Sequence, residues 1–78
     1  MSKKKKRLKK FLNNPQTTAY STIQTILIDH GFEKINAKGS HMKFKHPSLE
    51  DHIIFPIHQN DTKPLYKKIA ANILKKIL

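Results

Sequence analysis

The fold is decided by the stretch His41-Met42-Lys43-Phe44-Lys45-His46, in which polar and apolar side chains alternate. A period of two is typical of a strand with one buried face. The two faces separate the side chains into an inward and an outward set: Met42, Phe44 and His46 against His41, Lys43 and Lys45. We therefore expect this strand to lie in a sheet that is covered on one side.

Two further strands flank this stretch in the sequence. Residues 32–37 are short and partly alternating, and Gly39-Ser40 separates them from the next strand as a hairpin turn or bulge would. Residues 52–58 form the third strand, in which one face carries Ile53, Phe55 and Ile57. Because Pro56 has no N–H to donate to a ladder, this strand is expected at an edge or at a bulge.

Two segments have the three- and four-residue spacing of apolar side chains that predicts an amphipathic helix, residues 19–30 and 64–78. The first helix gathers on one face Tyr20, Ile23, Ile26, Leu27 and His30. The second gathers Tyr66, Ile69, Ala70, Ile73 and Ile77, with Lys67, Lys68 and Lys75 on the opposite side. Gly31 is expected to end the first helix as a left-handed cap. Asp61 or Thr62 is expected to begin the second.

The order of these elements predicts an α+β fold, a two-layer sandwich with the order α-β-β-β-α. Short connections favour a three-stranded antiparallel sheet. Both helices should pack on the one face that carries Met42 and Phe44. This order and layering are those of the double-stranded-RNA-binding-domain fold, but a fold does not fix a function.

Residues 1–18 differ from the rest and form a basic N-terminal extension. They begin with five consecutive basic residues, Lys3 to Arg7, and such runs are usually flexible. Leu8, Phe11 and Leu12 have the spacing of a short amphipathic turn. Two interpretations stay open, an arm that grips phosphates and a solvated tail.

The amino-acid composition indicates which class of partner the protein binds and in which compartment it is found. The 78 residues suffice for one domain, and 16 Lys and Arg against five Asp and Glu give a formal net charge of +11. Such a surplus favours a polyanionic partner. The absence of cysteine excludes disulfides and a thiolate nucleophile. With no disulfide, no secretory signal and no long apolar run, we expect a cytoplasmic protein.

The residues that could bind a phosphate and transfer a proton are Lys38-Gly39-Ser40-His41. Gly39 permits a turn that lets a phosphate approach backbone N–H groups, and the Ser40 hydroxyl can donate to a phosphate oxygen. A histidine can take or give a proton near neutral pH, and His41 would point away from the apolar face. With Lys38, Lys43 and Lys45 supplying positive charge, this set suits RNA cleavage by a histidine acting on a ribose 2′-hydroxyl.

These residue types also have other interpretations. A strand histidine beside lysines is often only a solvated surface residue. The histidines at positions 41, 46, 52 and 58 do not match a zinc-ligand spacing, and carboxylates are too few for a magnesium nuclease. We therefore expect neither a metal nor another cofactor. The general acid of the reaction is not identifiable, and His58 is a candidate for shaping the site.

The ordered set of motifs resembles the HicA (YcfA-like) family of toxins from type II toxin–antitoxin systems. The resemblance covers residues 20–78 and rests on these stretches: Ile26-Leu27 before Gly31-Phe32, Lys38-Gly39-Ser40-His41, Phe44, His46-Pro47, and Ile54-Phe55-Pro56-Ile57-His58. It implies an mRNA-cleaving ribonuclease in residues 19–78 with His41 as its essential residue, and a HicB-type antitoxin as partner. Many members carry a second histidine where this chain has Met42, and the lysine-rich extension exceeds the family's compact core.

Two competing functions remain. A non-catalytic RNA-binding module would use the same fold and the same basic surface. A membrane-surface protein would use the lysine arm between Lys3 and Lys10 to attract anionic lipid. RNA cleavage that depends on His41 separates the first hypothesis from both alternatives.

Overall fold

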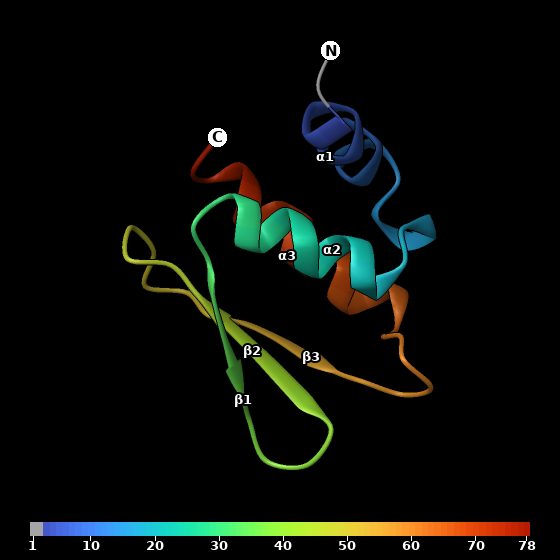
Figure 1. Ribbon diagram of the computed structural model, residues 1–78, viewed down its shortest axis with the longest axis vertical. Helices are drawn as coiled ribbons and strands as arrows, with labels where there is room; N and C mark the ends of the chain where they lie inside the picture. Colours follow the sequence, from blue (N-terminus) through green and yellow to red (C-terminus); the bar gives the residue numbers. More distant parts are fainter. Residues whose placement is uncertain (1–2) are drawn as a thin grey trace.

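The computed structural model describes residues 3–78, so Met1 and Ser2 of the predicted extension lie outside the described residues. The chain forms three α-helices, a short 3-10 helix and one sheet (Figure 1). Their bounds are α1 Lys3–Asn13, η1 Pro15–Thr17, α2 Tyr20–Asp29, β1 Glu33–Asn36, β2 His41–Lys45, β3 Ile53–Pro56 and α3 Pro64–Lys75. The predicted α+β order is therefore confirmed, with α1 added before it.

The sheet is antiparallel, and its order β1-β2-β3 places β2 in the centre. Phe44 pairs with Lys34 of β1 and Ile53 of β3, and His41 pairs with Pro56. Helices α2 and α3 lie side by side over one face of the sheet (Figure 1). Pro56 lies on an edge strand, as its missing N–H predicted.

The core lies between this face and the helices. Phe44 and Phe55 are wholly buried, and their rings meet edge to face at 5.7 Å between centroids. Tyr20 of α2 packs edge to face on Phe55 at 5.3 Å. Full burial of one such side chain contributes about 1.5–3 kcal/mol, so these rings account for much of what joins the two layers.

The N-terminal helix α1 is attached to this core through its apolar side. Phe11 is 0% exposed, and Leu8 and Leu12 pack partly buried beside it. The predicted amphipathic turn is thus an eleven-residue helix. A freely solvated tail does not describe residues 3–18, because burial of Phe11 fixes the helix against the domain.

Three expectations about α3 were wrong, and the first concerns Ile69, which was placed on the apolar stripe but is 44% exposed. Lys67 was placed on the solvent side, but it is only 4% exposed because Asp61 in the preceding loop pairs with it at 3.1 Å. Neither Asp61 nor Thr62 caps α3, whose N-cap is Lys63 without a side-chain hydrogen bond. Asp61 instead accepts the N–H of Tyr20, the first residue of α2, at 3.2 Å.

Gly31 ends α2 as predicted, with a φ of +90°.

Among residues 3–78, none of the helices is long and apolar enough to cross a bilayer.

Candidate active site

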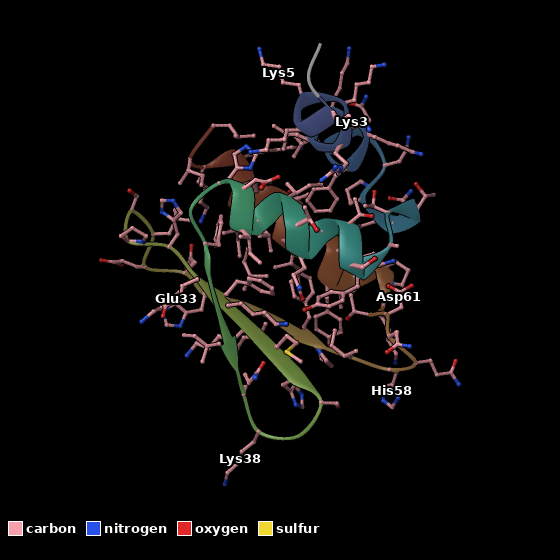
Figure 2. All side chains as sticks on the ribbon, in the orientation of Figure 1. Lys3, Lys5, Glu33, Lys38, His58 and Asp61 are labelled. Carbon is pink, nitrogen blue, oxygen red and sulfur yellow. The ribbon has the colours of Figure 1, made fainter. Side chains whose placement is uncertain are left out.

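The candidate site begins at the hairpin that joins β1 to β2. The Ala37 N–H donates to the His41 carbonyl at 3.1 Å and closes the hairpin. Gly39 adopts a φ of +68°, which favours glycine, and no atom beyond Gly39 and its two chain neighbours lies within 4 Å of where its Cβ would be. Lys38 stands at the tip and points away from the body of the molecule (Figure 2). The predicted turn is confirmed, and its backbone is open to a ligand.

His41 is the first residue of β2 and lies exposed on the face that the helices leave uncovered. Its Nδ1 is 3.3 Å from the Lys38 carbonyl oxygen. Because a carbonyl oxygen only accepts, this contact requires the proton on Nδ1. In the neutral imidazole with this tautomer, Nε2 carries the lone pair that can accept a proton from a bound molecule.

The three predicted lysines stand at different distances from this imidazole. Lys38 is in direct hydrogen-bond contact through its backbone, and Lys43 follows two residues along the same face of β2. At about 3.3 Å per strand residue, Lys43 starts roughly 7 Å from His41 and Lys45 roughly 13 Å. Lys45 also pairs with Glu33 at 3.5 Å. The structure thus places the backbone of Lys38 and Ser40 beside the histidine, Lys43 two residues along the same strand face, and Lys45 farther away.

Two other histidines have structural hydrogen bonds. His46 Nε2 donates to the His30 carbonyl at 3.0 Å, and His46 Nδ1 accepts the Ser48 N–H at 3.0 Å. His30 Nδ1 lies 2.8 Å from the Ile26 carbonyl oxygen near the end of α2. These rings hold the β2 end against α2. Within residues 3–78, histidine and acidic side chains form no cluster of three that could hold a metal ion.

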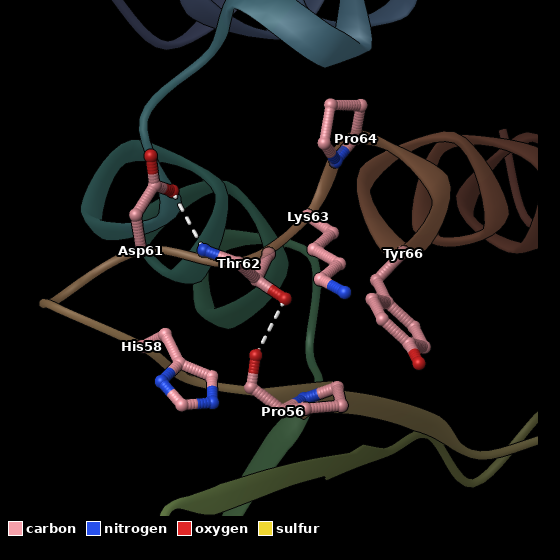
Figure 3. A pocket seen from close by; sticks show the side chains of 7 residues that line it. All are labelled: Pro56, His58, Asp61, Thr62, Lys63, Pro64 and Tyr66. Carbon is pink, nitrogen blue, oxygen red and sulfur yellow. Dashed lines mark hydrogen bonds between the residues drawn. The ribbon is translucent and has the colours of Figure 1, made fainter.

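A shallow pocket adjoins the cross-strand partner of His41. It holds about 450 Å³ and is lined by Pro56, His58, Asp61, Thr62, Lys63, Pro64 and Tyr66 (Figure 3). Lys63 and Tyr66 extend from the start of α3 toward Pro56 of β3 (Figure 3). The sequence carries no signal for this pocket, because it forms only where the start of α3 packs beside the end of β3.

Asp61 is one of the residues that line this pocket. Its Oδ1 accepts the N–H groups of Thr62 at 2.9 Å and Tyr20 at 3.2 Å, and pairs with Lys67 Nζ at 3.1 Å. Desolvation works to raise the pKa of Asp61, but the hydrogen bonds from Thr62, Lys67 and Tyr20 and the charge of Lys67 outweigh it. The pKa of Asp61 is therefore lower than usual, and the group is held ionised as a structural anchor.

The sequence model described as "HicA toxin of bacterial toxin-antitoxin" matches residues 20–78. The chain belongs to the HicA toxin family. Neither the curated proteins nor the solved structures yielded a match. Membership in a toxin–antitoxin family implies an antitoxin as a partner of this HicA toxin.

Met42 and helix α1 are two further features of this HicA toxin. Met42, which follows the candidate catalytic histidine, turns inward and packs half-buried against the core. It lies opposite Phe55 of β3, so Met42 faces inward as strand parity predicted. Helix α1 lies wholly outside the matched residues and is an addition to the family domain.

Proposed function

We propose that this HicA toxin is a metal-independent endoribonuclease that cleaves mRNA in the cytoplasm with His41 as general base. The observation that carries the proposal is the exposed imidazole with Nδ1 engaged by the Lys38 carbonyl and Nε2 left free. An imidazole in this state accepts a proton without rearrangement of the site. Family membership supports a toxic activity, and the net charge of +11 supports a polyanionic substrate.

The reaction is an internal transfer of the phosphate. His41 Nε2 removes the proton of the ribose 2′-hydroxyl, and the 2′-oxygen attacks the adjacent phosphorus. The bond from phosphorus to the 5′-oxygen breaks, which gives a 2′,3′-cyclic phosphate and a 5′-hydroxyl. The proton for the leaving oxygen comes from a lysine, from water or from the protonated His41. DNA lacks the attacking hydroxyl, so the mechanism selects RNA.

The hairpin supplies the charge stabilisation. Lys38 and Lys43 flank His41, the open backbone at Gly39 can present N–H groups, and the Ser40 hydroxyl can donate to a phosphate oxygen. Donors aimed at the developing negative charge are usually the largest single contribution to such catalysis. Lys45 is assigned a lesser role in binding a neighbouring phosphate, because Glu33 already neutralises part of its charge.

The antitoxin partner, which we propose is of the HicB type, would act by covering the open face of the sheet. Ile54 of β3 is half-exposed on this face and Ile35 of β1 lies partly exposed opposite Lys43. Apolar side chains on a charged surface favour a protein contact. A protein seated there would also cover His41 and block RNA.

The test is RNA cleavage by the purified chain in the presence of a chelator. His41→Ala is expected to lower the cleavage rate by about 10²- to 10⁴-fold, the usual contribution of a general base. The melting temperature should not change, because the imidazole is exposed and makes only one long hydrogen bond. The matched control is His52→Ala, an exposed loop histidine, which should cleave like the parent. Equal cleavage by His41→Ala and the parent would refute the mechanism.

The basic surface by itself favours a second candidate, a non-catalytic RNA-binding module. This alternative predicts salt-sensitive RNA binding by the parent without any product. Mass spectrometry of the RNA ends distinguishes the two, because only the proposed reaction leaves a 2′,3′-cyclic phosphate.

A further inference from the structure

Helix α1 concentrates positive charge to an unusual degree. Seven of its eleven residues are Lys or Arg and none is acidic. Lys4 of α1 pairs with Asp29 at 3.9 Å, and the ion pairs at Glu33, Asp51 and Asp61 involve lysines of other elements. Lys6, Arg7, Lys9 and Lys10 therefore present positive charge that no carboxylate of the described chain neutralises at salt-bridge distance.

This concentration of charge acts against the helix itself. Lysines four residues apart, such as Lys6 and Lys10, repel each other by about 0.2–0.5 kcal/mol per pair. Cations in the first turn also oppose the helix dipole. The helix persists because Phe11 is wholly buried and its apolar neighbours pack beside it. The basic side chains are thus held in a fixed array that costs stability.

Two grooves run along this array. One is lined by Lys5, Lys6, Lys9, Lys10, Asn13 and Asn14. The other is lined by Arg7, Lys10, Thr17, Thr18, Ala19 and Thr22. Both combine ammonium or guanidinium groups with side chains that can donate a hydrogen bond, and neither contains a carboxylate. This chemistry fits the phosphates of a polynucleotide.

We propose that α1 with these two grooves, the α1 surface, is a second RNA-binding site that holds the backbone of long substrates. The inference rests on the proposed ribonuclease function. Lys3 and Lys5 on α1 and Lys38 at the hairpin lie at opposite ends of the molecule (Figure 2). The longest dimension is 37 Å, which a stacked strand at about 3.4 Å per nucleotide covers in about 11 nucleotides.

The structure favours RNA over a membrane as the occupant. An interfacial helix needs a free apolar side to enter the lipid. In α1 that side is already used, because Phe11 is wholly buried and Leu8 and Leu12 pack against the core. What remains exposed is polar and basic.

The test compares Lys6→Gln/Lys10→Gln with Lys68→Gln/Lys75→Gln, two exposed lysines on α3 that serve as a charge-matched control. Substrates are an RNA of about 5 nucleotides and one of about 30, chosen around the 11-nucleotide span. The α1 variant should lose about tenfold in kcat/KM on the long RNA, on the order of one lost phosphate contact for each lysine, and less than twofold on the short one. The control should change less than twofold on both.

Binding measured in the His41→Ala background separates this proposal from the ribonuclease mechanism. There the α1 variant should bind the long RNA more weakly, and its negative slope of log K against log salt should become shallower by about 1.4. If the parent cleaves RNA but the α1 variant and its control behave alike on long RNA, the α1 surface is refuted while the ribonuclease stands. If long-RNA binding persists in the α1 variant but its binding to anionic vesicles disappears, a membrane is the occupant and the proposal is overturned.

Stability provides an independent readout. Removing two repelling lysines should leave the melting temperature of the α1 variant equal to or higher than that of the parent. A variant that cleaves long RNA poorly because it is misfolded would show the opposite change.

Discussion

The loop before α3 and the hairpin before β2 differ in how their side chains are engaged. In the first, Asp61 alone receives two backbone N–H groups and the ammonium of Lys67. In the second, the side chain of His41 has one long hydrogen bond, and Gly39 faces open space. The loop at Asp61, called the junction below, therefore stabilises the fold. The hairpin at Gly39 and His41 instead leaves its groups available to a substrate.

The largest expected effect on stability is at the junction. Asp61→Asn keeps an oxygen for the N–H groups of Tyr20 and Thr62 but leaves the buried Lys67 without its counter-charge. Removing one member of a buried pair costs 3–5 kcal/mol, and because half of the Asp61 side chain is exposed to water we expect a loss of about 2 kcal/mol. Urea unfolding measures it. The control Asp51→Asn, which breaks an exposed pair with Lys76, should change stability far less. Equal losses would contradict the assignment of Asp61 as an anchor.

Low pH should remove the stabilisation that the ionised Asp61 contributes. The pKa of Asp61 is below its ordinary value in the folded chain, so its ionised form stabilises the fold above the unfolded pKa of about 3.9. This stability is lost as the pH falls through the lower folded pKa. The difference in unfolding free energy between the parent and Asp61→Asn should therefore be constant above about pH 5 and shrink below about pH 4. A difference that persists unchanged at pH 2 would contradict this prediction.

Gly39 in the hairpin and Gly31 at the end of α2 should also differ in how much a substitution destabilises the fold. Gly39→Ala places an L-residue at a φ of +68° in open space, which costs about 1–2 kcal/mol from conformation alone. Gly31→Ala meets the same restriction at +90° and brings its Cβ 3.1 Å from His46 Nε2. Gly31→Ala should therefore be the more destabilising, and thermal unfolding ranks the two. The reverse order would show that the hairpin is packed more tightly than described.

The smallest effect is expected at the far end of β2. Lys45→Gln should reduce cleavage less than twofold, since Glu33 already engages this lysine and it stands roughly 13 Å along the strand from His41. Lys43→Gln, nearer to His41, should reduce it more. Cleavage rates that fall equally in both variants would show that the lysines act only through total charge.

The sequence was sufficient for local structure and insufficient for long-range contacts. The alternation in β2 and the left-handed conformation at Gly31 follow from neighbouring residues, and both were predicted. The role of Asp61 was missed because its partner Tyr20 lies 41 positions away. Lys67 was misplaced because a helical stripe cannot reveal a counter-charge contributed by another element.

In the candidate site, too, the sequence predicted the local features and missed those that depend on long-range contacts. His41 and its turn are contiguous in the sequence and were predicted together, although their chemistry stays a prediction. The pocket beside Pro56 depends on the packing of α3 beside β3, which no short-range pattern specifies. The docking of α1 was open because a run of lysines and a spaced Phe11 predict opposite outcomes, and only packing decides between them.

The contact between Thr62 and Pro56 has a consequence for self-association. The Thr62 hydroxyl donates to the Pro56 carbonyl at 2.7 Å, and proline has no N–H. Both hydrogen-bonding groups at this point of the β3 edge are thereby withdrawn from any incoming strand. Stacking of further chains into a continuous sheet is hindered on this side, so the free toxin is protected there against the edge-to-edge aggregation that open sheets invite.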